Sequence, residues 1–300
     1  MTAMKILIAV DGSDYSCRAV EFIASRRTLI NSQPAIEAFY VQSPLPANPA
    51  RVVGKKVVND YYAVEADRVL KPARQRLQDA GLNPIAQFVV GKPAIEISAR
   101  ADHNNVDLLV LGSHGHTALG GLVLGSVTAE VLVRTKKAML IVRGKVKTYV
   151  DSLRVGIAVD GSRYWQQAVR YVLKHLKLFG ANPQLTLIHV VQNYLLTLPP
   201  TSGIAQPAFS DSQVRELQDK EFDAAVEPAR ALLRKRPSCN ACQVRLVGNA
   251  AEELSAYAKA KLDLLVLGSH GYGAFKAAMM GSVATRVTAH SKVPLLLVRA

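Results

Sequence analysis

The chain has 300 residues, of which 49% are hydrophobic, 20% charged and 6% aromatic, a composition that excludes a disordered or fibrous protein. Its formal net charge of +14 is shared evenly, with 19 basic and 12 acidic residues in 1–150 and 18 and 11 in 151–300. Even basicity attracts anionic ligands, and since no Lys/Arg run is interleaved with aromatic residues, we do not expect a nucleic acid partner.

In chain order, the first half alternates between short β-rich runs and helical stretches. Ser13 is a plausible N-cap for the first helix, residues 61–79 form a longer amphipathic helix, and Pro93 suits the first turn of a third. Four of the five β-rich runs are nearly continuously apolar, which is typical of strands buried on both faces. The predicted strands are residues 4–10, 35–41, 85–90, 107–111 and 139–143.

The second half repeats the first. The nine residues 107–115, Asp-Leu-Leu-Val-Leu-Gly-Ser-His-Gly, recur unchanged 156 residues later as 263–271. The offset is 149 at the start of the repeat, so the second half carries seven extra residues, which fall in the Pro-, Ser- and Thr-rich connection 192–212. We predict two tandem domains, residues 1–147 and 151–300. Further matches are 8–13 with 157–162, 72–74 with 228–230, and 125–127 with 281–283.

Strands that alternate with helices imply βαβ units with right-handed crossovers. We therefore expect an α/β protein with two tandem, doubly wound, parallel five-stranded sheets, each with strand order 3-2-1-4-5. In such sheets ligands bind at the carboxyl ends of the strands where the order reverses, here after strands 1 and 4. The loops at these two positions are the ones that repeat best between the halves.

A glycine pattern with fixed spacing follows strand 4 in both halves. Glycines let the backbone approach a phosphate closely, adopt positive φ and present N–H groups. The helix that begins at the last glycine adds free N–H groups, a positive dipole end and a serine hydroxyl. The spacing therefore predicts a phosphate site in each half. The residues are Gly112, Gly115, Gly125 and Ser126 in the first half and Gly268, Gly271, Gly281 and Ser282 in the second.

An aspartate follows strand 1 in each half. Asp11 and Asp160 are both followed by Gly-Ser. Each carboxylate could accept hydrogen bonds from ribose hydroxyls or an adenine amine, or it could instead serve as the N-cap of the next helix. Both roles are open for either residue taken alone, and the neighbouring glycine loop favours the ligand.

On these motifs the chain resembles a tandem member of the universal stress protein family, over residues 4–142 and 154–298. The family's nucleotide motif, G-x2-G-x9-G-(S/T), is matched without gaps in 112–126 and 268–282. The resemblance implies an adenine nucleotide alpha hydrolase-like fold and bound ATP with a divalent metal such as Mg²⁺. It also implies slow hydrolysis at most, dimerisation through the last strand, and a regulatory role under stress.

The resemblance also assigns single residues. The aspartate of ATP-binding members falls on Asp11 and Asp160, and their adenine-contacting valine falls on Val41 and Val190. No residue is assigned a catalytic or metal-ligating role. The expected nucleotide-binding residues are Ala9, Asp11, Val41, Gly112, His114, Gly115, Gly125, Ser126 and Val127, and, in the second half, Ala158, Asp160, Val190, Gly268, His270, Gly271, Lys276, Gly281, Ser282 and Val283.

The two glycine loops depart from each other in charge. Residues 116–124 contain no Lys or Arg, although family members often have a basic residue there. The second loop carries Lys276, which could pair with a β- or γ-phosphate as a mobile point charge. We therefore expect the second half to bind nucleotide more firmly.

Three functional classes stay open: an ATP-binding regulatory protein, which the double motif favours; a slow ATPase or phosphotransferase; and a carrier whose cleft binds another phosphorylated or lipid-like ligand. No Walker lysine and no dinucleotide-type turn are present, which argues against a fast NTPase and a dehydrogenase. His114 and His270 fit a ligand contact or loop packing better than zinc or catalysis. The Cys239/Cys242 pair lacks further zinc ligands, and we interpret both as surface cysteines.

The expected partners are an adenine nucleotide and other copies of the same unit. Within one chain the halves should pair as a pseudo-dimer, edge to edge through residues 139–143 and 294–298, and two chains could then form a homodimer. A protein partner is not specified. No apolar run approaches the roughly 18 residues of a membrane span, so we expect a cytoplasmic protein.

Overall fold

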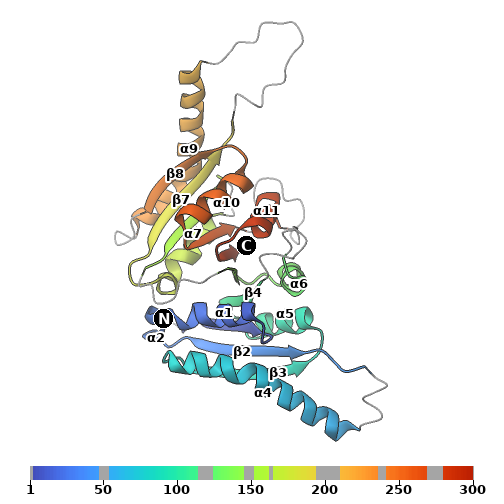
Figure 1. Ribbon diagram of the computed structural model, residues 1–300. Helices are drawn as coiled ribbons and strands as arrows, with labels where there is room; N and C mark the ends of the chain where they lie inside the picture. Colours follow the sequence, from blue (N-terminus) through green and yellow to red (C-terminus); the bar gives the residue numbers. More distant parts are fainter. Residues whose placement is uncertain are drawn as a thin grey trace, which may run out of the picture.

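A computed structural model describes residues 3–46, 54–113, 124–144, 152–161, 165–193, 210–235, 241–268 and 280–299. Both halves show the predicted alternation of strands and helices (Figure 1). The first half contains β1 (Lys5–Val10), α1 (Asp14–Ala24), α2 (Arg27–Ile30), β2 (Ala35–Gln42), α4 (Lys55–Asp79), β3 (Pro84–Val90), α5 (Pro93–His103), β4 (Leu108–Gly112), α6 (Ser126–Arg134) and β5 (Met139–Val142). The second half contains β6 (Arg154–Ala158), α7 (Trp165–Lys174), the 3-10 helix η1 (Leu176–Phe179), β7 (Gln184–Val191), α9 (Asp211–Arg234), β8 (Ala241–Val247), α10 (Ala250–Lys261), β9 (Leu264–Gly268), α11 (Ser282–His290) and β10 (Leu295–Val298).

The strands form one continuous 10-stranded sheet with the order β3-β2-β1-β4-β5-β10-β9-β6-β7-β8. Each half has the predicted parallel order 3-2-1-4-5, which is confirmed. The two five-stranded sheets join edge to edge through β5 and β10, as predicted, and the pairing is antiparallel, with Leu140 opposite Leu296. All four residues of β5 are buried, as are those of β10, since helices cover both faces of the central strands.

Helices cover the sheet in two layers, and each layer encloses a core that runs through both halves. α1, α4, α7 and α9 pack on one face, where Ile8 and Ile157 occupy equivalent positions. α5, α6, α10 and α11 pack on the other face, where Leu109 and Leu265 do so. The halves therefore share their hydrophobic cores instead of folding around two separate ones.

Two predicted helix starts are confirmed and one is wrong. The Ser13 hydroxyl accepts a hydrogen bond from Ser16 N–H at 3.3 Å and caps α1, and Pro93 begins α5. Helix α4 begins at Lys55 and not at residue 61. Its first turn follows Gly54, which has a φ of 83° and no side-chain cap, and this turn buries no residue fully. Apolar periodicity therefore gave no signal for it.

The repeat has a small irregularity. β6 starts 149 residues after β1 and α9 starts 156 residues after α4, as the sequence comparison gave. β8 starts 157 residues after β3, and β9 returns to an offset of 156 from β4. Equivalent residues of the two outer strands are therefore 157 positions apart.

Within the described part of the chain, no helix is both long and apolar enough to cross a membrane.

Candidate functional site

The carboxyl edge of the first half gathers the ends of three neighbouring strands. Ala9 pairs with Leu111 on β4 and with Phe39 on β2. In this register Asp11, one residue past β1, lies level with Val41 on β2 and next to the end of β4 at Gly112. The topology therefore brings together the aspartate, valine and first glycine that the sequence assigned to one site.

The second half repeats this arrangement with the same register. Ala158 pairs with Ile188 on β7, as Ala9 pairs with Phe39 on β2. Asp160 is exposed just past β6 and lies level with Val190 on β7, while Gly268 ends β9 next to β6. The two edges are thus built alike from strands of different sequence.

The alanine and valine of each site lie on the α5/α6 or α10/α11 face of the sheet. Ala9 and Val41 are buried there. Ala158 and Val190 are partly buried against the same core. This is also the face on which the two glycine-capped helices begin, so an adenine near the valine and a phosphate near the helix would lie on one side of the sheet.

Asp11 is not the N-cap of α1, because Ser13 holds that position. Instead its Oδ1 accepts a hydrogen bond from Ser13 N–H at 2.9 Å, and its own N–H donates to the Ser16 hydroxyl at 3.3 Å. The surrounding protein disfavours the charged carboxylate, but hydrogen bonds from Ser13 and Ser16 outweigh that effect and hold the pKa of Asp11 below its ordinary value. Asp11 is therefore an ionised, oriented acceptor at neutral pH.

Gly12 and Gly161 are residues that the sequence argument did not single out. They adopt φ values of 78° and 75°, the left-handed region that favours glycine. Each turns the chain directly after the aspartate, between the strand and the following segment. The repeated Asp-Gly-Ser triplet contained this signal.

Gly112 is required by close packing within the protein, a reason that the spacing did not indicate. A Cβ at this position would lie 2.2 Å from the carbonyl carbon of Tyr15 and 2.6 Å from Ser16 N. The end of β4 therefore touches the first turn of α1, and no side chain fits between them. Gly112 is also absent from the residues with positive φ. Close packing within the protein thus accounts for this glycine without a phosphate.

Gly125 and Gly281 directly precede helices α6 and α11 as their N-cap residues. These N-cap residues have φ and ψ of −49° and 142°, and of −59° and 151°, an extended conformation open to any residue. Glycine has no side chain with which to cap the helix, and among the described residues no other side chain caps either one. The first helical residues Ser126 and Ser282 are exposed, and Val127 and Val283 follow them, partly buried and 38% exposed respectively.

Ser113 connects the parts of the first site and was not predicted. Its side chain is buried, and its hydroxyl accepts a hydrogen bond from Gly125 N–H at 3.4 Å. Its own N–H donates to the Val142 carbonyl at 3.1 Å. Ser113 therefore holds the start of α6 beside the end of β4.

The other predicted residues of the loops lie outside the described residues: His114, Gly115, His270, Gly271 and Lys276.

A buried histidine distinguishes the second half. His189 Nδ1 donates to the Val159 carbonyl at 2.7 Å, directly before Asp160, and His189 Nε2 lies 3.7 Å from Glu221 Oε1. In the first half the equivalent residue is Tyr40, whose hydroxyl donates to Gln42. The histidine therefore fixes the end of β6 next to Asp160.

Among the described residues, no group of three or more His, Cys, Asp and Glu side chains is placed to hold a metal ion.

The fold and the repeated edge together define a class: a tandem α/β protein with an adenine nucleotide alpha hydrolase-like architecture. The sequence model of the universal stress protein family matches residues 2–143 and 153–299, one match in each half. The chain belongs to the universal stress protein family.

Some members of the family match nearly the whole chain, and others match only part of it. A universal stress protein of Mycolicibacterium smegmatis is 27% identical over 314 residues, which cover 99% of this chain and 98% of the relative. Universal stress protein MJ0577 of Methanocaldococcus jannaschii is 37% identical over 81 residues, which cover 27% of this chain and only 50% of that relative. The crystal structure of a universal stress protein from Archaeoglobus fulgidus covers 100% of this chain and 99% of its own, with a TM-score of 0.68. Its identity is 20%, so this likeness concerns the fold alone.

Proposed function

We propose that the chain is an ATP-binding regulatory protein of the stress response, with one adenine nucleotide in each of the domains 1–147 and 151–300. Occupancy by nucleotide would change its partners or its assembly. In each half the base lies against the valine near the end of the second strand, the ribose lies at Asp11 or Asp160, and the phosphates lie at the start of α6 or α11. The proposal includes Mg²⁺ bound through the phosphate oxygens, because this ion often reaches proteins by way of a substrate's phosphates.

One observation carries this proposal. Two equivalent helices, α6 and α11, have glycine as N-cap residue, Gly125 and Gly281, and among the described residues no side chain caps them. Each helix follows a strand that flanks the point where the strand order of its half reverses. A helix start with open N–H groups and a positive dipole end attracts a phosphate. Ser126 and Ser282 add an exposed hydroxyl at the same place. An ionised Asp11 nearby matches the hydroxyl donors of a ribose.

The site favours binding over turnover. A general base works best when its pKa lies near the working pH. The pKa of Asp11 lies below its ordinary value, after burial and the opposing hydrogen bonds are combined, and its Oδ1 is already engaged by Ser13 N–H. Asp11 is therefore a weak proton acceptor, and we expect hydrolysis to be slow or absent.

We further propose that the second half binds ATP more tightly. Besides Lys276 in its loop, α11 carries Arg286 where α6 carries Glu130. Glu130 forms an ion pair with Arg134 at 2.7 Å, so the first half gains no net positive charge on this helix. The phosphate region of the second half is thus the more positive one, which favours a polyanion.

The first experiment is to denature the purified protein and identify any released nucleotide by chromatography, quantified per chain. We expect ATP or ADP from the wild type, and one nucleotide fewer from each of Gly125→Val and Gly281→Val. Both glycines have backbone angles that valine can adopt, so the variants should fold. At limiting ATP, Gly281→Val should lose more nucleotide than Gly125→Val.

The alternatives give different results. Release of no nucleotide, together with no rise in melting temperature on adding ATP and Mg²⁺, would overturn the proposal and favour a carrier of another phosphorylated or lipid-like ligand. Steady phosphate release from added ATP, lost in Asp11→Asn or Asp160→Asn, would favour the slow ATPase. Unchanged nucleotide content in both folded valine variants would place the ligand elsewhere.

A further inference from the structure

The two outer edges of the sheet differ in charge. β3 and β8 are equivalent strands of the repeat, and they form opposite ends of the 10-stranded sheet. β8 contains Arg245, whereas the seven residues of β3, Pro-Ile-Ala-Gln-Phe-Val-Val, include no charged side chain. An unprotected edge strand offers unpaired N–H and C=O groups to another chain.

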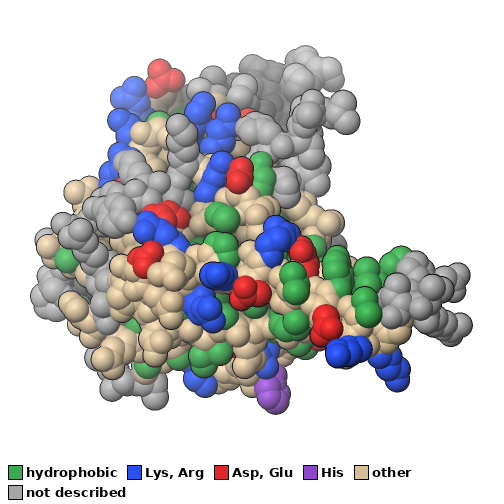
Figure 2. Space-filling view, turned by 60° about the horizontal axis from the view of Figure 1, so that its bottom comes forward, with side chains coloured by type: hydrophobic (Ala, Val, Ile, Leu, Met, Phe, Trp, Pro, Cys, Tyr) green, Lys and Arg blue, Asp and Glu red, His purple; other side chains and the backbone are tan. Residues whose placement is uncertain are grey.

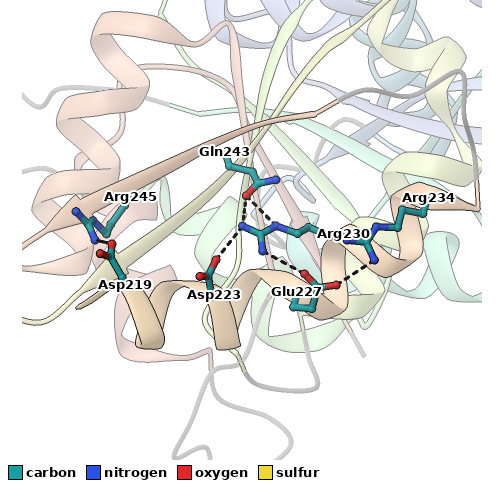
Figure 3. Close-up of polar contacts among 7 residues, drawn as sticks. All are labelled: Asp219, Asp223, Glu227, Arg230, Arg234, Gln243 and Arg245. Atoms are coloured by element: carbon teal, nitrogen blue, oxygen red, sulfur yellow. Dashed lines mark hydrogen bonds and ion pairs between the residues drawn. The ribbon is translucent and has the colours of Figure 1, made fainter. Parts of the chain in front are cut away.

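The β8 edge is protected by a network of ion pairs with α9 (Figure 3). Arg245 pairs with Asp219. Arg230 donates to Gln243 on β8 at 2.9 Å and pairs with Asp223 at 3.0 Å and Glu227 at 3.1 Å. These charged side chains line the edge strand, and a second strand would have to displace or desolvate them to pair there.

The first half has apolar residues at the positions of the ion pair that joins α9 to β8. Phe88 on β3 is equivalent to Arg245, and Ala63 on α4 is equivalent to Asp219. Exposure confirms that the surface is open, with Ile85 61%, Phe88 38% and Val90 41% exposed. Figure 2 shows the molecule from below α4 and β3, with hydrophobic side chains on this face between charged ones. The Asp219–Arg245 pair of the β8 edge thus has apolar equivalents at the β3 edge, while Gln87 in the middle of β3 accepts a hydrogen bond from Arg100 of α5.

We infer that β3 is an interface with a second copy of this chain, through antiparallel β3–β3′ pairing that extends the sheet across the two molecules. The strand is self-complementary in this arrangement. When the strand is reversed about its central Gln87, Ile85 lies opposite Val89 and Ala86 lies opposite Phe88. All facing pairs except Gln87 with its copy are therefore apolar. Such cross-strand pairs stabilise a sheet.

Charge restricts where two copies can meet. Each chain carries +14, so copies repel one another over most of their surface. The seven residues of β3 add no charge of their own to this repulsion. The edge-facing side of α4 adds complementarity, because Asp60 and Asp67 precede Lys71 and Arg74, all exposed, at helical spacings that place them on one side. Two-fold symmetry runs α4 antiparallel to its copy and sets the acidic end of each against the basic end of the other.

The chain already uses this mode of association once. Its two halves join by antiparallel pairing of β5 with β10, which are equivalent edge strands of the two units. The proposed contact repeats that geometry at the opposite edge of the first unit and continues the same sheet. It does not involve the carboxyl edge, so it holds with or without bound nucleotide.

Sedimentation velocity of the full chain over a concentration series tests the interface, with Val90→Lys as variant and Val247→Lys as matched control. The two valines are equivalent residues, 41% and 40% exposed, on β3 and β8. We expect the wild type and Val247→Lys to reach twice the mass of one chain and Val90→Lys to remain at the single-chain mass.

A second variant places the ion pair of the β8 edge at the equivalent positions of the β3 edge. The double substitution Ala63→Asp and Phe88→Arg recreates the Asp219–Arg245 pair on the first half and should also remain monomeric. Far-UV circular dichroism checks that each variant is folded, and the two variants change different residues so that failure of one to fold leaves the other decisive. A wild type that is monomeric throughout, a folded variant that still doubles its mass, or equal dissociation by Val247→Lys would overturn the inference.

Discussion

Arg299, which follows the last strand of the second half, donates from Nη1 to the Thr135 carbonyl at the end of α6 in the first half, at 2.8 Å. It also donates to the Leu132 carbonyl. The repeat makes this contact reciprocal, since Arg143 follows β5 and its Nη1 donates to the Ala289 carbonyl in α11 at 3.5 Å. Each half thus supplies a cation to the C-terminal end of the other half's last helix, where the free carbonyls and the dipole favour it.

The two arginines should differ in their contribution to stability. Arg299→Met removes two hydrogen bonds from a charged donor across the halves, and we expect it to lower the free energy of unfolding by about 1.5–3 kcal/mol. Arg143 is buried, its Nε and Nη2 have no partner in the described structure, and burial lowers its pKa to about 10. Arg143→Met should therefore cost less. Urea unfolding of both variants measures this, and a larger loss for Arg143→Met would contradict it.

The shared cores predict that the halves unfold together. Leu140 on β5 is fully buried and faces Leu296 on β10. We expect Leu140→Ala to cost about 2–5 kcal/mol through lost burial and a cavity. Because the cores are continuous, urea should unfold the variant in one transition when monitored by fluorescence of Trp165 in the second half. A variant in which that signal keeps the wild-type midpoint would show that the halves are independent.

Asp11 should make stability depend on pH in the acidic range. Its pKa in the folded protein lies below the ordinary 3.8, where hydrogen bonds from Ser13 and Ser16 outweigh burial. A lowered pKa contributes stability that is present above the ordinary value and is lost as the pH falls through the folded value. Asp11→Asn should therefore be less stable than the wild type at neutral pH. The difference in unfolding free energy should shrink once the pH falls below 3.8, the ordinary pKa of an aspartate. Unfolding free energies of nucleotide-free protein across pH measure it, and a difference that grows towards acid would contradict the assignment.

Gly112 should act on folding and not directly on the ligand. Alanine at this position places a Cβ 2.2 Å from backbone atoms of Tyr15, so that α1 or the end of β4 must move. We expect Gly112→Ala to lower the stability by about 1–3 kcal/mol, as overpacking does. Thermal unfolding in the absence of nucleotide measures this loss. Gly281→Val provides the comparison, since it should leave the melting temperature of nucleotide-free protein unchanged.

Sequence alone determined the duplication, the class of fold and the strand order of each half. Nine identical residues at 107–115 and 263–271 revealed two copies of one unit, and alternating apolar strands and helices implied a doubly wound parallel sheet. The gathering of Asp11, Val41 and Gly112 at one edge followed from that topology. These features are local or periodic, so they can be read from neighbouring residues in the chain.

Tertiary structure decided which surfaces meet. The sequence predicted that residues 139–143 and 294–298 meet edge to edge, but the register that sets Leu140 opposite Leu296 depends on how the two units approach each other. Gly112 matched a phosphate motif by spacing, yet its need for glycine arises from Tyr15 on another element. The contrast between β3 and β8 appeared only when Arg245 was found opposite Asp219 of α9. A residue's pattern in the chain reports that it is buried or exposed, whereas the neighbour that covers it lies far away in sequence and is set by packing.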